Sequence, residues 1–163
     1  MVLDTEMRYL RRCLELAREA LDAGDAPFGS VLVDSTGRIL KEDRNRVQTG
    51  RDLTLHPEFT LAQWASQHLS PEERAAATIY TSGEHCPMCS TLHAYAGLGR
   101  IVYVASAQQF VQWRAEFGGR PSSVHMRPIN DIAPGVLVEG PVPQLEDAIR
   151  ELHRLKAVRT AAK

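Results

Sequence analysis

The chain lacks the features that define several broad classes of protein. Only three cysteines occur among its 163 residues, so no disulfide framework is indicated. Its apolar runs fall far short of the roughly 20 residues that a membrane-spanning helix needs. Residues 1–6 are acidic, whereas a signal peptide is basic and then apolar. We therefore expect a cytoplasmic protein with no membrane partner.

Strong net charge and internal repetition are also missing. The formal net charge is −1, and the lysines and arginines are scattered along the chain, which argues against a nucleic-acid partner. One C-terminal run forms a modest basic helix, which we interpret as a solvated face although it could help to hold RNA: Arg150, His153, Arg154, Lys156, Arg159 and Lys163. With no linker and 44% hydrophobic residues, we predict a single domain over residues 1–163.

Two short motifs carry the chemistry that the sequence does contain. His56 and Glu58 lie in a His-Pro-Glu triplet, and Cys86 and Cys89 lie in a Cys-Pro-Met-Cys run 30 positions after the histidine. A structural zinc is usually closed by four protein ligands, whereas a catalytic zinc keeps three and leaves the fourth position for water. We therefore predict one Zn²⁺ per chain, held by His56, Cys86 and Cys89 with water or hydroxide as the fourth ligand. Glu58 would move protons to and from that water.

The local context strengthens each motif, since either alone is weak. Cys86 follows a strand-like run, and Pro87 suits the first position of a helix, so Cys89 would share a helix face with Cys86. The apolar spacing after Pro57 predicts a second helix to Leu69, which begins at His56. Two helix amino termini would then point at one metal.

A purely structural zinc in a binding module is an alternative from a different class. It would need a fourth ligand, and His85 is the one serious candidate, although its adjacency to Cys86 makes joint coordination awkward. A non-catalytic partner subunit is a third possibility, but such a subunit usually lacks the proton-transferring glutamate, and here Glu58 is present.

The order of expected elements indicates an α/β protein. Helices and strands alternate, and the later strands each return through a helix, which implies a mixed sheet between helical layers. We expect helices at 4–22, 57–69, 108–117 and 144–157, with another that begins at Pro87, and strands at 29–34, 38–42, 78–81, 100–104 and 135–139.

These motifs resemble the zinc-dependent cytidine-deaminase-like superfamily, with its H-x-E and P-C-x-x-C signatures. The resemblance runs from the Asp25–Ser30 stretch to the strand at 100–104 and is closest to the branch of guanine deaminases and tRNA-adenosine deaminases. It implies a three-layer α/β/α sandwich with a mixed five-stranded sheet, and a homodimer. It also implies substrate-binding roles: Asn45 bonds the substrate ring, Phe28 is the aromatic of a P-F-G turn, and Tyr95 is an aromatic pocket wall.

The resemblance implies hydrolytic removal of an exocyclic amine, with release of ammonia, from a small heterocyclic substrate. A free nucleobase or analogue suits an acidic chain: a cytosine-like or guanine-like base, an oxidised or aza base, or an aminotriazine. Guanine deaminases carry an acid in the segment after the fourth strand, but residues 106–111 contain none, which argues against guanine as the principal substrate. Deamination of tRNA adenosine is the alternative within the superfamily.

Several further residues carry weaker expectations. We expect His85 to face solvent or to cap a strand, and His68, His125 and His153 to lie on the surface. Phe110, Trp113 and Phe117 recur at helical spacing, which predicts core packing for at least two of them and leaves a pocket wall or a subunit contact open. Cys13 is expected to be a buried inert thiol. The Gly- and Pro-rich stretch 118–134 could form a lid.

Overall fold

The computed structural model describes residues 4–162, so the start of the acidic amino-terminal segment and Lys163 lie outside it. The helices are η1 (Asp4–Glu6), α1 (Met7–Ala23), α2 (Val47–Gly50), α3 (Pro57–His68), α4 (Pro71–Ala76), α5 (Pro87–Tyr95), α6 (Ala107–Glu116), α7 (Ile129–Ile132) and α8 (Pro143–Ala161). The strands are β1 (Gly29–Val33), β2 (Ile39–Arg44), β3 (Thr78–Gly83), β4 (Arg100–Ala105) and β5 (Val138–Glu139). No helix within the described part of the chain is long and apolar enough to cross a membrane.

The strands form one mixed sheet in the order β2-β1-β3-β4-β5. β1 is antiparallel to both β2 and β3. A tight turn at Gly37, with φ of 85°, joins β1 to β2 as a hairpin. β3, β4 and β5 are parallel, because α5 and then α6 and α7 carry the chain back between them. The predicted mixed five-stranded sheet is confirmed.

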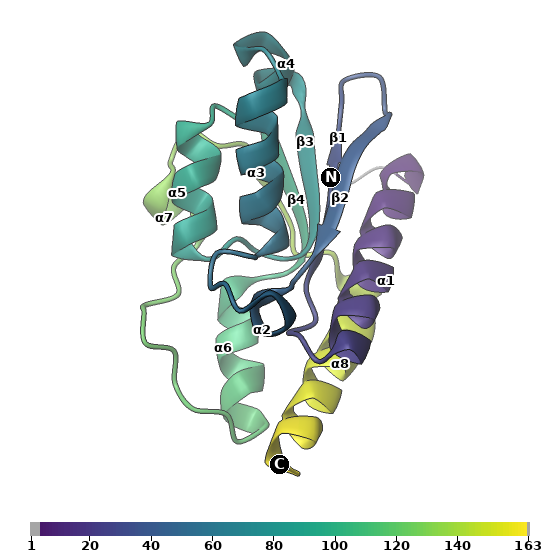
Figure 1. Ribbon diagram of the computed structural model, residues 1–163, viewed down its shortest axis with the longest axis vertical. Helices are drawn as coiled ribbons and strands as arrows, with labels where there is room; N and C mark the ends of the chain where they lie inside the picture. The colour runs from purple at the N-terminus through teal and green to yellow at the C-terminus, as the bar shows by residue number, and fades with distance from the viewer. Residues whose placement is uncertain (1–3, 163) are drawn as a thin grey trace.

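Helices cover both faces of this sheet, which confirms the three-layer sandwich. α1 and α8 pack on one face around residues such as Val31 and Val102, and α3 and α5 pack on the other around Leu32 and Ile79 (Figure 1). α1 approaches β1 closely at Gly29, where a Cβ atom would lie 2.5 Å from the carbonyl oxygen of Cys13. Cys13 itself is fully buried in this layer, as expected.

The structure departs from the predicted elements in several places. β5 has two residues rather than five. α4 is an additional helix that begins at Pro71, soon after the predicted end of the preceding helix at Leu69; Ser70 and Glu73 form a capping box there, with Pro71 at the first helical position. The stretch 118–134 contains α7, whose Ile129 is buried in a small cluster with Ile101 and Tyr103, so this end of the proposed lid is anchored.

Candidate metal and proton-transfer site

The two motifs meet at the carboxyl end of β3, where the amino termini of α3 and α5 converge. His56 is the N-cap residue of α3 and Cys86 is the N-cap residue of α5, with Pro57 and Pro87 as the first helical residues. Open α/β sheets place ligands at this edge. The helix amino termini also favour negative charge, and therefore thiolates, at the site.

The three predicted ligand atoms form a compact group whose spacing fits one zinc ion. Cys86 Sγ lies 3.5 Å from Cys89 Sγ, and each sulfur lies 3.7 Å from His56 Nδ1. Tetrahedral zinc, with Zn–S and Zn–N bonds of about 2.3 and 2.0 Å, separates two sulfurs by about 3.8 Å and a sulfur from a nitrogen by about 3.5 Å. The donor set of two sulfurs and one imidazole is also the type that zinc prefers. These residues could therefore hold the metal with little rearrangement.

Without metal, the group stores protons that a bound cation would displace. The pKa of Cys86 falls to about 4 because Cys89 and His56 hydrogen-bond to its sulfur. The pKa of Cys89 rises well above its usual range, because its thiol donates to Cys86 and is buried beside the Glu58 carboxylate. The pKa of His56 rises mainly through its contact with Cys86. Since zinc binds thiolates and neutral imidazole, its uptake must release protons.

Glu58 lies beside this group, in the first turn of α3. Its side chain is 4% exposed, and burial raises its pKa to about 7. Oε2 is 4.0 Å from Cys89 Sγ, whereas Oε1 accepts a hydrogen bond of 2.9 Å from Thr81 Oγ1. A carboxyl group with this pKa can both accept and donate a proton near neutral pH.

Asn45 and Phe28 lie together at the same edge of the sheet. The backbone N–H of Asn45 donates to the carbonyl of Phe28 at 2.9 Å, and the Asn45 side-chain Oδ1 accepts from the N–H of Val47 at 3.1 Å. Asn45 is buried, and its Nδ2 has no protein acceptor among residues 4–162. The amide is thus fixed by its oxygen and keeps two N–H donors for another group.

An aromatic cluster adjoins Phe28 on the site side of β3. The ring of Phe28 packs edge-to-face on Phe110 at 5.2 Å and against His153 at 4.9 Å, and Phe110 packs on Trp113 at 5.3 Å. A Cβ atom on Gly83 would lie 2.5 Å from the Phe110 ring and 2.9 Å from that of Phe28, so only glycine admits both rings. Trp113 belongs to the core cluster under α1 and α8, and Phe110 and Phe117 pack against that cluster, which confirms the predicted core packing. Phe117 also lies under the Arg150 guanidinium.

The structure does not bring Tyr95 to the site. Tyr95 ends α5, whereas Cys86 precedes its first residue, so about 13 Å of helix separates the two backbones. Its side chain is 87% exposed. Tyr95 therefore lies at the opposite end of α5 from the metal group, and its role as an aromatic pocket wall stays a prediction.

Two histidine expectations are also wrong. His85 does not face solvent: it is fully buried, and its ring packs edge-to-face on His93 at 5.3 Å. Among residues 4–162 the metal-binding group comprises His56 and the two cysteines and does not include His85, which removes the fourth ligand that a structural zinc would need. His153 does not lie on the surface, since its Nε2 is inaccessible to solvent and the ring is packed among aromatic side chains.

The sequence argument missed the polar groups that hold these residues. Asp25 is fully buried and accepts hydrogen bonds from the Thr49 backbone and hydroxyl and from Arg44, which fixes the loop around Asn45. Thr81 and Ser30, both fully buried, hold Glu58. A weak signal was available for Thr81, because two hydroxyl residues interrupt a buried strand just before Cys86.

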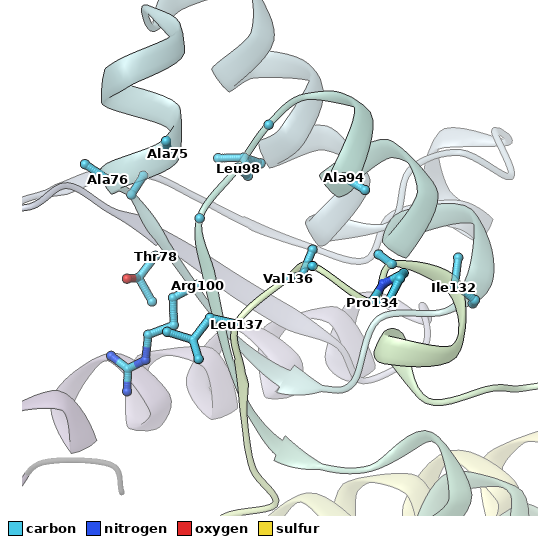
Figure 2. Close-up of a pocket in the computed structure, with 15 residues that line it drawn as sticks. Ala75, Ala76, Thr78, Ala94, Leu98, Arg100, Ile132, Pro134, Val136 and Leu137 are labelled. Carbon is cyan, nitrogen blue, oxygen red and sulfur yellow. The ribbon is translucent and has the colours of Figure 1, made fainter.

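One surface cavity lies away from this site. A cavity of about 740 Å³ lies at the amino ends of β3 and β4, lined by small apolar side chains such as Ala76, Leu98 and Val136 (Figure 2). Its one charged residue, Arg100, is already paired with Glu6 and Glu139. The cavity therefore offers no free catalytic group.

Curated relatives that match this chain include deaminases and a tRNA-modifying enzyme. A probable cytosine deaminase of Schizosaccharomyces pombe is 29% identical over 118 residues, which are 72% of this chain and 71% of that protein. Guanine deaminase of Bacillus subtilis is 37% identical over 98 residues, 60% of this chain and 62% of that protein. A tRNA(Ile)-lysidine synthase of Deinococcus deserti is 32% identical over 160 residues, 96% of this chain but 29% of that protein, so the chain corresponds to a minor part of it.

Solved structures agree with the fold. Guanine deaminase from Nitrosomonas europaea matches with a TM-score of 0.75 at 21% identity, over 97% of this chain and 87% of that one. A structure from a study of A-to-I editing by tRNA:A34 deaminases matches with a TM-score of 0.64 at 26% identity, over 90% of this chain and 99% of that one. The cytidine-deaminase-like fold is thereby confirmed.

The family match covers the whole metal group. Residues 3–105 match the model of the cytidine and deoxycytidylate deaminase zinc-binding region, and this stretch contains both motifs. The match and the grouping of His56, Cys86 and Cys89 together support one Zn²⁺ in the chain. The chain belongs to the cytidine and deoxycytidylate deaminase zinc-binding family.

Proposed function

We propose that this zinc-dependent deaminase acts on a small free nucleobase or base analogue and releases ammonia. The observation that carries the proposal is the buried Glu58 carboxyl, which directs one oxygen to the group formed by His56, Cys86 and Cys89. A structural zinc site has no use for a buried proton carrier at this place, since burying an ionisable group is costly.

The proposed chemistry divides between the metal and the chain's own side chains. Zinc held by His56, Cys86 and Cys89 would activate water for attack at neutral pH. Glu58, buried beside these ligands, would take the water proton, give it to a ring nitrogen and later protonate the departing amine. The overall reaction consumes one water, breaks one C–N bond, forms one C–O bond and releases one ammonia.

Asn45 and Phe28 would orient the substrate ring. The free Nδ2 of Asn45 suits a ring nitrogen or carbonyl acceptor, because its Oδ1 is already fixed by Val47. Phe28 presents an aromatic ring supported by Phe110, which suits the face or edge of a planar heterocycle. Both assignments are proposals, as are those of the metal ligands and Glu58.

The charges on α8 support a small substrate rather than RNA. Arg150 pairs with Glu116 and Arg154 pairs with Glu151, and Arg159 donates to the carbonyl of Leu21, so these charges are partly neutralised or committed. An RNA-binding face needs cations that can neutralise phosphates. Lys163 lies outside the described residues.

Deamination of tRNA adenosine is the second candidate. It is favoured by the match to a structure from work on tRNA:A34 deaminases, because the match covers 99% of that structure's chain. The substrate panel below separates the two proposals directly.

We also propose a homodimer of this single domain. Large apolar side chains are exposed at Leu53, Tyr95 and Leu137, which are 80%, 87% and 63% accessible, and such residues are common in subunit contacts. Sedimentation velocity of the zinc-loaded protein tests this directly: one species at monomer mass across the concentration range would contradict it.

The test of function is ammonia release by the zinc-loaded protein. The panel contains guanine, cytosine and adenine, their oxidised and aza analogues, aminotriazines, the nucleosides and a tRNA anticodon stem. Glu58→Gln should abolish turnover and keep zinc, whereas Glu72→Gln, at an exposed carboxylate on α4, should keep both turnover and zinc. Activity on RNA alone would favour the second candidate, and near-normal activity in Glu58→Gln would refute the assigned proton carrier.

A further inference from the structure

A chain of buried hydroxyl groups ends on the proton-carrying glutamate. Ser30 Oγ donates to Thr81 Oγ1 at 2.9 Å, and Thr81 Oγ1 donates to Glu58 Oε1 at 2.9 Å. Ser30 and Thr81 are fully buried, and Glu58 is nearly so. The pairing depends on the sheet register, because Ser30 lies directly opposite Thr81 across the antiparallel pair of β1 and β3.

The direction of these hydrogen bonds follows from the ionised Glu58 carboxylate, which can only accept. A hydroxyl has one hydrogen and two lone pairs, so the single hydrogen of Thr81 Oγ1 points to Glu58. Thr81 Oγ1 must then accept from Ser30 Oγ, and its acceptor side also lies 3.4 Å from the N–H of Gly83.

This arrangement makes the two oxygens of Glu58 unequal. Oε1 is held as an acceptor by Thr81, and a proton on Oε1 would face the hydroxyl hydrogen. Oε2 is free of this contact and lies 4.0 Å from Cys89 Sγ, on the side of the metal ligands. A proton carried by Glu58 thus belongs on Oε2, where a substrate and an activated water would meet it.

We propose that Thr81, locked by Ser30, is a positioning residue that holds Glu58 with Oε2 as its working oxygen. This inference deepens the proposed function and rests on it. Thr81 does not touch the reacting atoms; it acts by keeping the carboxyl from rotating and by excluding the proton from Oε1. Turnover should depend on its hydroxyl, whereas zinc binding and substrate binding should not.

The test removes the hydroxyl without changing the shape of the side chain. Thr81→Val should lower kcat by about 10- to 100-fold, the range expected when a charged group loses one hydrogen bond, and should leave KM within about twofold. Thr81→Ser should restore most of kcat. Ser30→Ala should lower kcat less than Thr81→Val, and should add little further loss in the Thr81→Val background, because both act through one contact.

A neighbouring hydroxyl provides the matched control. Ser82 is equally buried in β3 but accepts from the N–H of Gly29 and does not contact Glu58. Ser82→Ala should therefore cost stability and leave kcat unchanged. Zinc content, measured by metal analysis, should stay at the wild-type value in all of these variants.

Crystal structures of the zinc-loaded proteins give a readout that is independent of turnover. The wild type should show one carboxyl orientation with Oε2 toward Cys89, and Thr81→Val should show a rotated or divided carboxyl. The proposal is overturned if Thr81→Val keeps both the wild-type kcat and the wild-type carboxyl position. If Glu58→Gln is also fully active, the proposed function fails as well, whereas an inactive Glu58→Gln beside an unaffected Thr81→Val refutes the positioning role alone.

Discussion

His153 provides a direct test of the burial seen beside the site. Its ring packs on Phe28 at 4.9 Å and on Phe110 at 4.6 Å, and its Nε2 is inaccessible to solvent and has no partner within the described chain. Burial lowers the pKa of His153 to about 3, only partly offset by a backbone hydrogen bond at Pro27. The folded protein therefore resists protonation of this imidazole.

The pKa difference of His153 between the folded and unfolded states sets the sign and size of the change in stability with pH. The unfolded chain binds a proton at His153 below about pH 6.5, and the folded protein does not until about pH 3. The stability that depends on a neutral His153 is thus fully present above the unfolded-state pKa of about 6.5, and it is lost progressively as the pH falls below that value. Between about pH 7.5 and pH 5 the loss assigned to this residue is about 2 kcal/mol, at 1.36 kcal/mol per pH unit below the unfolded pKa.

The assay compares urea unfolding of the wild type with that of His153→Phe, which keeps an aromatic ring in the cluster. The free energy of unfolding of the variant, relative to the wild type, should improve by about 1–2 kcal/mol from about pH 7.5 to pH 5. His125→Gln, at an exposed position, should show a much smaller change. If the wild-type and His153→Phe curves run parallel over this range, the buried neutral imidazole is refuted.

Three further substitutions test other parts of the molecule. Cys89→Ser should weaken zinc binding by more than about 100-fold in a competition titration, since a direct ligand outweighs the outer partners, whereas Cys13→Ser should keep zinc. Asp25→Asn should cost about 2–4 kcal/mol in urea unfolding, because it weakens a buried carboxylate that holds four donors. Gly83→Ala should cost about 1–3 kcal/mol by crowding Phe110, and adding Phe110→Leu should recover part of that loss; equal losses in the single and double variants would contradict this packing.

The metal group could be predicted from sequence because each half of it is local. Cys86 and Cys89 are one helical turn apart, and His56 and Glu58 share the start of another helix, so short-range geometry fixes each pair. Only the meeting of the two helix ends required the fold. The strand order supplied that meeting, because β2 and β3 are each antiparallel to β1 and so run in the same direction. Their carboxyl ends, which lead to His56 and Cys86, therefore lie at one edge of the sheet.

The errors fall on residues whose surroundings come from distant parts of the chain. His153 lies on a polar helix face by sequence, yet Phe28 and Phe110 enclose its ring from segments more than 40 residues away. His85 looked free beside the first cysteine, but the turn from β3 into α5 directs it inward against His93. Helical spacing describes one element, and it does not report what packs across it.

The hydroxyl chain marks the limit of local prediction most clearly. Ser30 and Thr81 are 51 positions apart, and both are ordinary strand residues by propensity. Because side chains alternate along a strand, a shift of one residue in the pairing of β1 and β3 would turn Thr81 away from Glu58. The contact that orients the proton carrier is therefore a property of sheet register. The residues that hold Glu58 should be sought on the strand that its helix packs against rather than beside it in the sequence.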